Sequence, residues 1–238
     1  MNKAFSNPII LAVDTSSIEE AEKLVLSLRD YIGGIKIGME FFNSCGPAGV
    51  SSIQKFGVPI FLDLKLHDIP ATVYKTVSTL LKLNPAIINV HASGGKEMMI
   101  QASRALKDSN NKDTKLIAVT ILTSLDNGDL KDIGFSDTSD ALVLQLAQLA
   151  KDSGLDGIVC SAKEISTIRK AIGEDFLLVV PGIRPEDNKL NDQKRTMTPK
   201  GAISEGADLL VIGRPITQSD DQVSALMNIL EQIKWHIK

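Results

Sequence analysis

The sequence is poor in cysteine and has no long hydrophobic run. Its two cysteines, Cys45 and Cys160, lie far apart and have no Cys or His partner at metal-ligand spacing. We therefore expect reduced, buried thiols in a cytoplasmic protein rather than a disulfide. No apolar stretch approaches the roughly 20 residues that a membrane-spanning helix needs, and the opening MNKAFSNP lacks the pattern of a signal peptide. These features predict a protein with no membrane partner.

A large excess of one charge is also missing. The formal net charge is −3, so the composition gives no indication of a nucleic-acid or acidic-membrane partner, although it leaves room for a local basic pocket that binds a small anion. The chain is long enough for one large domain with a sizeable core, and no linker or low-complexity segment divides it. We therefore expect residues 1–238 to form a single domain.

Short apolar runs alternate with amphipathic segments along the whole chain. Repeated strand–helix units predict a parallel sheet, and eight of them in this length predict an α/β fold of the closed (β/α)₈, or TIM-barrel, type. A doubly wound open sheet is the alternative. The expected strands cover residues 8–14, 33–39, 59–66, 86–92, 115–122, 156–160, 176–183 and 208–214, and helical patterns cover 19–31, 72–83, 96–107, 141–154, 162–173 and 222–235.

One polar stretch is longer than an ordinary connection. Residues 184–199 follow the seventh expected strand and carry mostly polar side chains. A loop of this length in a compact domain is usually either disordered or functional. Its position after a late barrel strand predicts an active-site lid.

Charged side chains interrupt the expected strands. In FLDLKL, Asp63 and Lys65 share one face and the leucines share the other, because side chains alternate along a strand. Lys36 and Asp14 likewise point away from their apolar neighbours. If helices cover the apolar face, the charges point into the barrel near the strand ends where barrel enzymes keep their active sites. Burying a charge costs several kcal/mol per ion, so we interpret the array as catalytic, with a structural ion-pair network as the alternative.

Two glycine–arginine segments end the last two expected strands. VPGIRP and VIGRPI place Gly182 and Gly213 beside an arginine, and glycine permits close approach of the backbone to a ligand. Backbone N–H groups and an arginine suit a phosphate, which barrels often bind after strands seven and eight. We therefore expect a phosphate site there.

The histidines give a weaker signal. His67 and His91 could act as acids or bases, or could be hydrogen-bonded structural residues. Together with His236 they show no metal-ligand spacing. We expect no metal site.

The arrangement of these residues resembles a known family. DLKLHDIPATV (63–73) is similar to the Asp-x-Lys-x-x-Asp signature of the orotidine 5′-phosphate decarboxylases in their shorter bacterial form. LAVD, IKIG, VTILTS, PGIRP, DQKRTMTP and VIGRPI occur in the family's order, so the resemblance covers nearly the whole chain. Ala71 departs from the family's common asparagine, whereas Thr72 is retained.

The resemblance implies decarboxylation of orotidine 5′-monophosphate to UMP in pyrimidine biosynthesis, by a cytoplasmic homodimer that needs no cofactor. Lys65 would protonate the C6 carbanion, and Asp63 would lie near the departing carboxylate. Lys36 and Asp68 would complete the catalytic array, with Asp68 and Thr72 reaching into the neighbouring subunit's site. The substrate-binding residues would be Asp14, Lys36 and Thr72 for the ribose, Thr123 and Ser124 for the base, and Arg184, Gln193, Gly213 and Arg214 for the phosphate, with Gln193 on the lid bridging phosphate and base.

The chemistry of this reaction fits the charged strand residues. Decarboxylation leaves electron density on a ring carbon without an adjacent carbonyl, and no cofactor motif that could accept it is evident. A fixed ammonium group must then stabilise the carbanion and protonate it. Two alternatives stay open: a related phosphate-binding barrel that uses Mg²⁺ to hold an enediolate, and an inactive barrel that serves as a nucleotide sensor.

Overall fold

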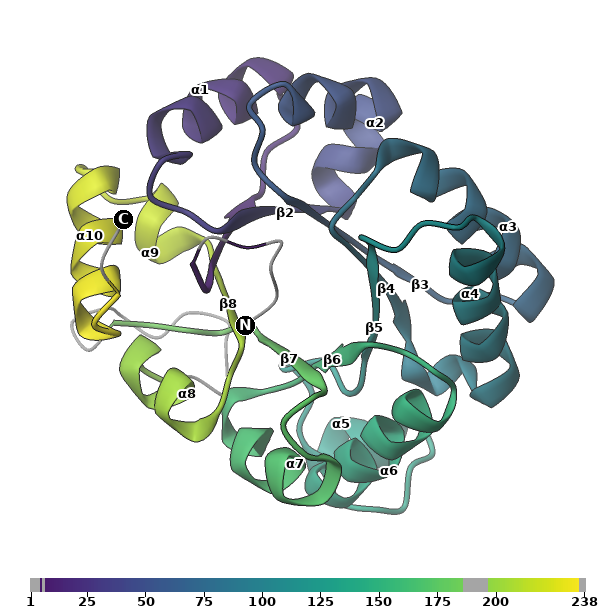
Figure 1. The fold of residues 1–238 in the computed structure, drawn as a ribbon. Helices are drawn as coiled ribbons and strands as arrows, with labels where there is room; N and C mark the ends of the chain where they lie inside the picture. Colours follow the sequence, from purple (N-terminus) through teal and green to yellow (C-terminus); the bar gives the residue numbers. More distant parts are fainter. Residues whose placement is uncertain (1–4, 6, 186–196, 236–238) are drawn as a thin grey trace.

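Eight parallel strands form a closed barrel at the centre of the molecule (Figure 1). The computed structural model describes residues 5, 7–185 and 197–235. The strands are β1 (Ile9–Val13), β2 (Gly34–Gly38), β3 (Ile60–Leu66), β4 (Ile87–His91), β5 (Lys115–Val119), β6 (Gly157–Val159), β7 (Leu177–Val180) and β8 (Leu209–Ile212). Each strand pairs in parallel with the next, and β1 pairs with β8. The predicted TIM barrel is confirmed, and the open sheet is wrong.

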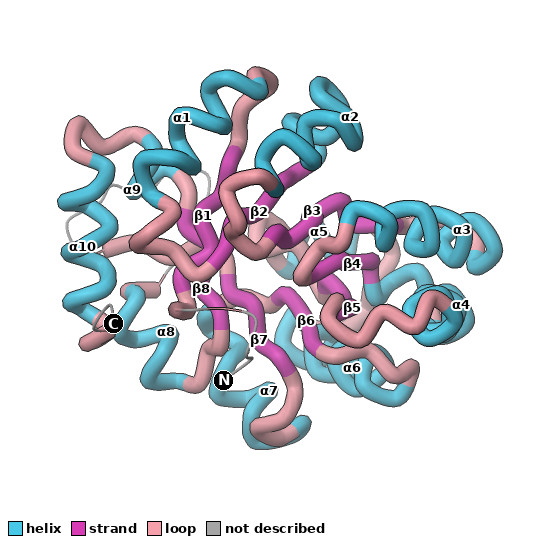
Figure 2. The backbone as a smooth tube through the Cα atoms, turned by 45° about the horizontal axis from the view of Figure 1, so that its top comes forward, coloured by secondary structure: helices cyan, strands magenta, loops and turns pink. Residues whose placement is uncertain are grey.

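The helices surround the strands as an outer ring (Figures 1 and 2). They are α1 (Ile18–Leu28), α2 (Met39–Gln54), α3 (Pro70–Leu80), α4 (Lys96–Asp108), α5 (Asn127–Asp132), α6 (Ser139–Asp152), α7 (Ile165–Ile172), α8 (Pro199–Glu205), α9 (Arg214–Thr217) and α10 (Gln222–Gln232), with 3₁₀ turns η1 (Leu81–Leu83), η2 (Ala92–Gly94) and η3 (Ala162–Glu164). Local sequence sets several starts. Ser17 caps α1 by accepting a hydrogen bond from the Glu20 N–H, and Pro70 occupies the first turn of α3.

Helix α2 is the main element that the periodicity did not indicate. Its middle contains Gly46 and Pro47, and Gly46 has φ 59° and ψ −163°, so two helical pieces meet there at a kink. Glycine and proline normally interrupt a helical pattern. The short helices α5, α8 and α9 were not expected either.

The hydrophobic core has two layers, because alternate strand residues face opposite sides of the barrel wall. The outer layer packs the strands against the helices, with Leu11, Ile37 and Leu62 among its members. The inner layer fills the barrel and consists of Phe5, Ile10, Ala12, Phe61, Ile87, Ile117, Val179, Leu209 and Val211. Directly after β1, and on β2 and β3, charged residues continue the inward-facing series toward the strand C-termini.

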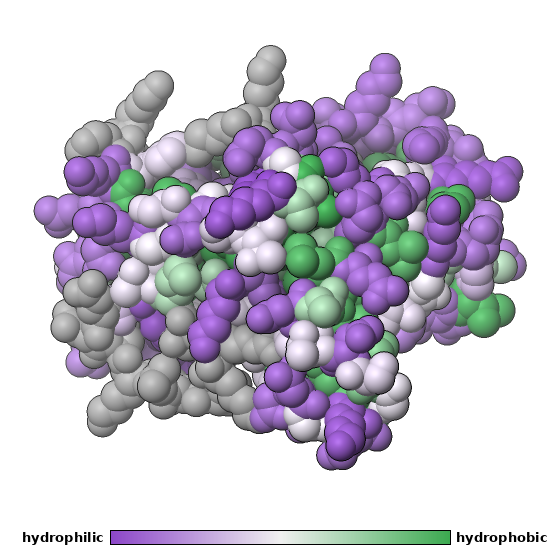
Figure 3. Space-filling view, turned by 90° about the horizontal axis from the view of Figure 1, so that it is seen from below, coloured by the Kyte–Doolittle hydropathy of each residue, from purple (hydrophilic) through white to green (hydrophobic). Residues whose placement is uncertain are grey.

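The described surface is mainly polar. On the side shown in Figure 3, polar side chains predominate and hydrophobic ones gather near the middle of the view. Within the described residues, no helix is both long and apolar enough to span a membrane. Both cysteines are free thiols, but only Cys160 is buried, so the expectation of two buried thiols is wrong for Cys45, which is half-buried.

Candidate active site

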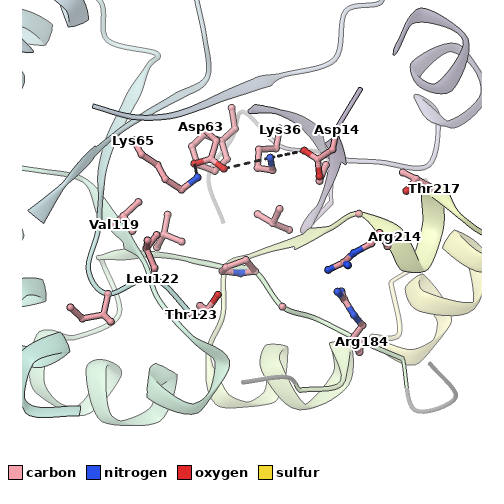
Figure 4. Close-up of a pocket in the computed structure, with 18 of the residues that line it drawn as sticks. Asp14, Lys36, Asp63, Lys65, Val119, Leu122, Thr123, Arg184, Arg214 and Thr217 are labelled. Carbon is pink, nitrogen blue, oxygen red and sulfur yellow. Dashed lines mark hydrogen bonds and ion pairs between the residues drawn. The ribbon is translucent and has the colours of Figure 1, made fainter. Parts of the chain in front are cut away.

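A pocket of about 520 Å³ opens at the C-terminal ends of the strands (Figure 4). This volume lies in the range of small-molecule sites. Its lining is contributed by β1, β2, β3, β5, β6 and β8 and by residues that follow β1, β5, β7 and β8. Eight of the predicted site residues line it: Asp14, Lys36, Asp63, Lys65, Thr123, Arg184, Gly213 and Arg214.

Four charged side chains of alternating sign run along one wall of this pocket (Figure 4). The ammonium of Lys65 donates to Asp63 Oδ1 at 2.7 Å. The other oxygen, Asp63 Oδ2, lies 3.5 Å from Lys36 Nζ, which in turn donates to Asp14 Oδ1 at 3.1 Å. We call the chain Lys65–Asp63–Lys36–Asp14 the charged row. Because adjacent charges are opposite, each carboxylate offsets the cost of burying its neighbouring ammonium.

Asp63 is the buried centre of the charged row. Its side chain is 12% exposed, whereas that of Asp14 at the end of the row is 58% exposed. Burial alone raises the pKa of Asp63. The ammonium groups of Lys36 and Lys65 and the hydrogen bonds from Lys65 and Asn89 outweigh it, so the pKa lies below its ordinary value. Asp63 is therefore an anion at neutral pH and holds both ammonium groups in place.

A glycine makes room for the ammonium of Lys36. A Cβ atom on Gly38 would lie 3.0 Å from Lys36 Nζ, closer than such contacts normally come. The glycine that ends β2 thus allows the lysine side chain to fold over the strand end toward Asp14 and Asp63.

Strand β3 is irregular where it carries Lys65. Leu62 pairs with Ile88 and Leu66 with Val90, so the register shifts between the two pairs. Lys65 has φ 51°, in the left-handed region that a lysine rarely adopts. The wholly buried Asn89 on β4 contacts both Lys65 and Asp63 at this point. Asn89 was not among the predicted site residues, and its only signal in the sequence is a polar residue within the apolar run AIINVHA.

Two arginines face the charged row across the pocket (Figure 4). Arg184 follows β7 and Arg214 begins α9, with Gly213 directly before it. The Arg184 guanidinium donates to the Ile183 carbonyl through Nη1 at 2.9 Å. Two guanidinium groups that line one pocket form a site for an anion with several oxygens, such as a phosphate.

The remaining pocket wall between these two charged sides is largely apolar. Val119, Ile121, Leu122 and Thr123 line it at the end of β5. Ser124, which was expected to face the base beside Thr123, is exposed and is not among the described residues that line the pocket.

Asp68 and Thr72 lie outside this pocket, on the exposed segment that joins β3 to α3 and on the first turn of α3. Asp68 Oδ1 accepts a hydrogen bond from the Ile69 N–H, and Ile69 itself is 66% exposed. Nearby, the rings of His67 and His91 lie with their centroids 5.4 Å apart and their planes tilted by 37°. Burial, His67 and Lys65 together lower the pKa of His91, although Asp63 opposes them.

Two expectations fall on residues that the structure does not describe. Gln193 lies outside the described residues, as does most of the predicted lid at 184–199, namely 186–196. Their roles stay predictions. Among the residues that are described, no group of three or more His, Cys, Asp or Glu side chains could hold a metal ion.

Comparison with known proteins gives a consistent result. Residues 7–229 match the family model described as "Orotidine 5'-phosphate decarboxylase / HUMPS family". A protein of Sphingopyxis alaskensis named orotidine 5'-phosphate decarboxylase is 51% identical over 91% of this chain and 94% of its own. One of the same name from Ehrlichia canis is 50% identical over 95% and 98%. The crystal structure of orotidine 5'-phosphate decarboxylase from Lactobacillus acidophilus superposes with a TM-score of 0.85 at 37% identity, over 95% of this chain and 99% of that one.

Proposed function

The chain belongs to the orotidine 5'-phosphate decarboxylase / HUMPS family, and from this premise we propose that it converts orotidine 5′-monophosphate to UMP in pyrimidine biosynthesis without a cofactor. The names of its relatives support the reaction. The observation that carries the mechanism is the charged row, which faces two arginines across one pocket. A cytoplasmic location is proposed with the biosynthetic role.

Lys65 is the proposed acid. Loss of CO₂ leaves a carbanion at C6 of the pyrimidine, and an ammonium group held beside that carbon stabilises the charge as it forms. The same group then supplies the proton that completes the product. The hydrogen bond from Lys65 to Asp63 supports this role, because it fixes the ammonium at the pocket wall. Asp63 would lie beside the departing carboxylate.

The rest of the substrate would extend from the charged row to the arginines. Asp14 and Lys36 bind the ribose hydroxyls in this proposal, and Thr123 contacts the base with Ser124 beside it. Arg184, Gly213 and Arg214 hold the phosphate. The apolar wall at the end of β5 supports placement of the flat base between the two charged sides. Gln193 and the lid at 184–199 are predicted to close over the phosphate.

The phosphate has a second use in this proposal. It is remote from the reacting carbon, so its binding energy can order the site before the reaction. Loss of the phosphate is then expected to lower turnover as well as affinity. Substrate binding by the two arginines and reaction at Lys65 are therefore coupled.

Purified protein tests the reaction directly. Ultraviolet absorbance follows the loss of orotidine 5′-monophosphate with EDTA present, and we expect full turnover. The matched substrate control is orotidine, which lacks the phosphate and should react much more slowly. No loss of orotidine 5′-monophosphate, together with turnover of a sugar phosphate that requires added Mg²⁺, would favour the metal-dependent chemistry of a related barrel. Tight nucleotide binding without turnover would favour a sensor.

We also propose that two copies share each active site, with Asp68 and Thr72 reaching the neighbour. The exposed position of both residues, next to the exposed Ile69, supports a contact with a second copy. In a twofold dimer each site would take Lys65 from one chain and Asp68 from the other.

Mixing two inactive variants tests this arrangement. Lys65→Ala and Asp68→Ala homodimers should both be nearly inactive. Subunit exchange should create heterodimers with one doubly altered site and one intact site. At random pairing, activity should recover to roughly a quarter of the wild-type total. Absence of recovery despite demonstrated exchange would show that Asp68 acts within its own chain or that the active species is a monomer.

A further inference from the structure

Asn89 joins the backbone of one pocket residue to the side chain of another. Its Oδ1 accepts a hydrogen bond from the Lys65 N–H at 2.8 Å, and its Nδ2 donates to Asp63 Oδ1 at 2.7 Å. A backbone N–H can only donate, so the amide oxygen must face Lys65 and the amide nitrogen must face Asp63. The side chain is wholly buried on β4, and its two contacts fix its orientation.

The irregularity of β3 creates the need for this side chain. Between the pairs Leu62–Ile88 and Leu66–Val90, three residues of β3 stand opposite Asn89 alone. A left-handed backbone at Lys65 persists only where the surroundings hold it. The register shift leaves the Lys65 N–H in need of an acceptor, since buried backbone donors are nearly always paired. Asn89 supplies that acceptor.

The second contact of Asn89 reaches the other end of the same lysine. Asp63 Oδ1 accepts from the Asn89 amide and from the Lys65 ammonium, both at 2.7 Å. One rigid amide therefore fixes the backbone from which the Lys65 side chain departs and the carboxylate to which its tip is bonded. Displacement of the amide would move both.

We propose that Asn89 is a positioning residue for the decarboxylation: by holding the bulge in β3 and the Asp63 carboxylate, it aims the Lys65 ammonium at the reacting carbon. The inference rests on the proposed function. Asn89 itself touches no reacting atom in this scheme. Its effect should therefore appear in the chemical step rather than in substrate affinity, because the arginines that would hold the phosphate are on the opposite wall.

Asn89→Ala removes both contacts, and Asn7→Ala is the matched control. Asn7 is also a buried asparagine with one donated and one accepted hydrogen bond, to the Tyr31 carbonyl and from the Ile9 N–H, both at 2.9 Å. It precedes β1, at the end of the barrel away from the pocket. For Asn89→Ala we expect kcat to fall by about 100-fold, the scale of a misplaced reacting group, with KM changed less than about threefold. Asn7→Ala should keep wild-type kcat.

Asn89→Asp tests the contact with Asp63 separately from the contact with the Lys65 N–H. It also provides a second variant in case Asn89→Ala does not fold. Its carboxylate keeps an acceptor for the Lys65 N–H but sets an oxygen against Asp63. We expect hydrogen exchange of the Lys65 amide, followed by NMR, to stay slow in Asn89→Asp and to become fast in Asn89→Ala. Turnover should fall at least about tenfold in both.

Three outcomes would overturn the inference: kcat within threefold of wild type in either folded variant, an equal loss in Asn7→Ala, or unchanged exchange at Lys65 in Asn89→Ala. If the alanine variant does not fold, the aspartate variant alone decides. Failure of the proposed function looks different, because the wild-type protein would then not consume orotidine 5′-monophosphate at all. The exchange measurement needs no substrate and tests the Asn89 contact in either case.

Discussion

Two clusters of buried charge lie at opposite ends of the barrel and differ in how fully their cations are bonded. Arg169 on α7 is 7% exposed, and its guanidinium donates to the carbonyls of Gly173, Glu174, Phe176 and Gly206 and to the carboxylate of Asp208. All three of its nitrogens are used. In the charged row, the ammonium of Lys65 donates a hydrogen bond to Asp63. Among the described residues it has no other hydrogen-bond partner, and the Lys65 side chain is 25% exposed at the pocket.

The difference separates a structural charge from a reactive one. A guanidinium whose donors all meet carbonyl and carboxylate oxygens ties chain segments together and has little capacity left for a ligand. An ammonium has three protons, so a single strong bond to a carboxylate orients it and leaves donor capacity toward the pocket. Burial alone does not distinguish the two clusters. They differ in whether the cation has N–H donors left that face the pocket.

The largest expected effect is on activity, from Lys65→Ala. Removal of the ammonium removes both the proton donor and the charge that stabilises the carbanion, so turnover should fall by at least about 10⁴-fold. The fold should survive, because the side chain is partly exposed to the pocket. Steady-state kinetics and circular dichroism measure the two properties. Near-native turnover in a folded variant would exclude Lys65 as the acid.

The reciprocal change at the other cluster is Arg169→Met, which should act on stability instead. It leaves several carbonyls and the Asp208 carboxylate, which is 37% exposed, without their buried partner, and the loss of hydrogen bonds to a charged group costs about 1.5–3 kcal/mol. Urea denaturation should show this loss in the free energy of unfolding. The fraction that stays folded should keep the wild-type kcat, since Arg169 is remote from the pocket.

Arg169→Lys sharpens the same test. A lysine keeps the charge but cannot reproduce the planar fork that reaches several oxygens at once. Its stability should therefore lie between those of the wild type and Arg169→Met. If either variant loses more activity than its smaller folded fraction accounts for, Arg169 contributes to catalysis and the distinction between the two clusters is wrong.

A smaller effect is expected at the arginine wall. Arg214→Ala should lower kcat/KM for orotidine 5′-monophosphate by about 100-fold, the scale of lost hydrogen bonds to a charged group. The loss for orotidine should be much smaller. Arg104→Ala, at an arginine on α4 whose side chain is 64% exposed, is the control and should change neither value. Equal losses for the two substrates would contradict phosphate binding by Arg214.

Most of the fold, and the inward-facing charged residues of the site, could be predicted from the sequence. Alternation of apolar runs and amphipathic segments located all eight strands to within a few residues, because strand and helix periods differ. Inward placement of Asp63 and Lys65 followed from the two-residue period of a strand. Alternation assumes a regular strand, however, and so it gave no sign of the register shift at Lys65.

The residues that the sequence did not reveal depend on contacts between distant segments. Asn89 is one polar residue in an apolar strand, and its value comes from β3, which no local pattern connects to it. Arg169 occupies an amphipathic helix, where an arginine normally indicates a solvent-exposed face, and its partners lie in loops up to 39 residues away. Such interactions become visible only once the chain has closed into the barrel.

The smallest expected effect concerns the pH dependence of stability and tests the centre of the charged row. Burial by itself raises the pKa of Asp63, but Lys36, Lys65 and Asn89 together bring it below the ordinary value of 3.8. A carboxyl group with a lower pKa in the folded state binds its proton less readily there than in the unfolded chain. Its ionised form therefore adds stability above the unfolded pKa, and this addition is lost as the pH falls through the folded pKa.

The variant Asp63→Asn removes this dependence, because a side-chain amide does not titrate in this range. The free energy of unfolding of the wild type minus that of the variant should decrease as the pH falls below about 4, whereas at higher pH the difference also contains the effect of Asp63 on the pKa of His91. Urea denaturation at a series of pH values measures this difference. A difference that instead increases as the pH falls below about 4 would mean that burial outweighs the two ammonium groups and raises the pKa of Asp63. The charged row would then not hold Asp63 as a permanent anion between Lys36 and Lys65. The contrast with Arg169, whose guanidinium nitrogens are all hydrogen-bonded, could then not be explained by the charge of Asp63.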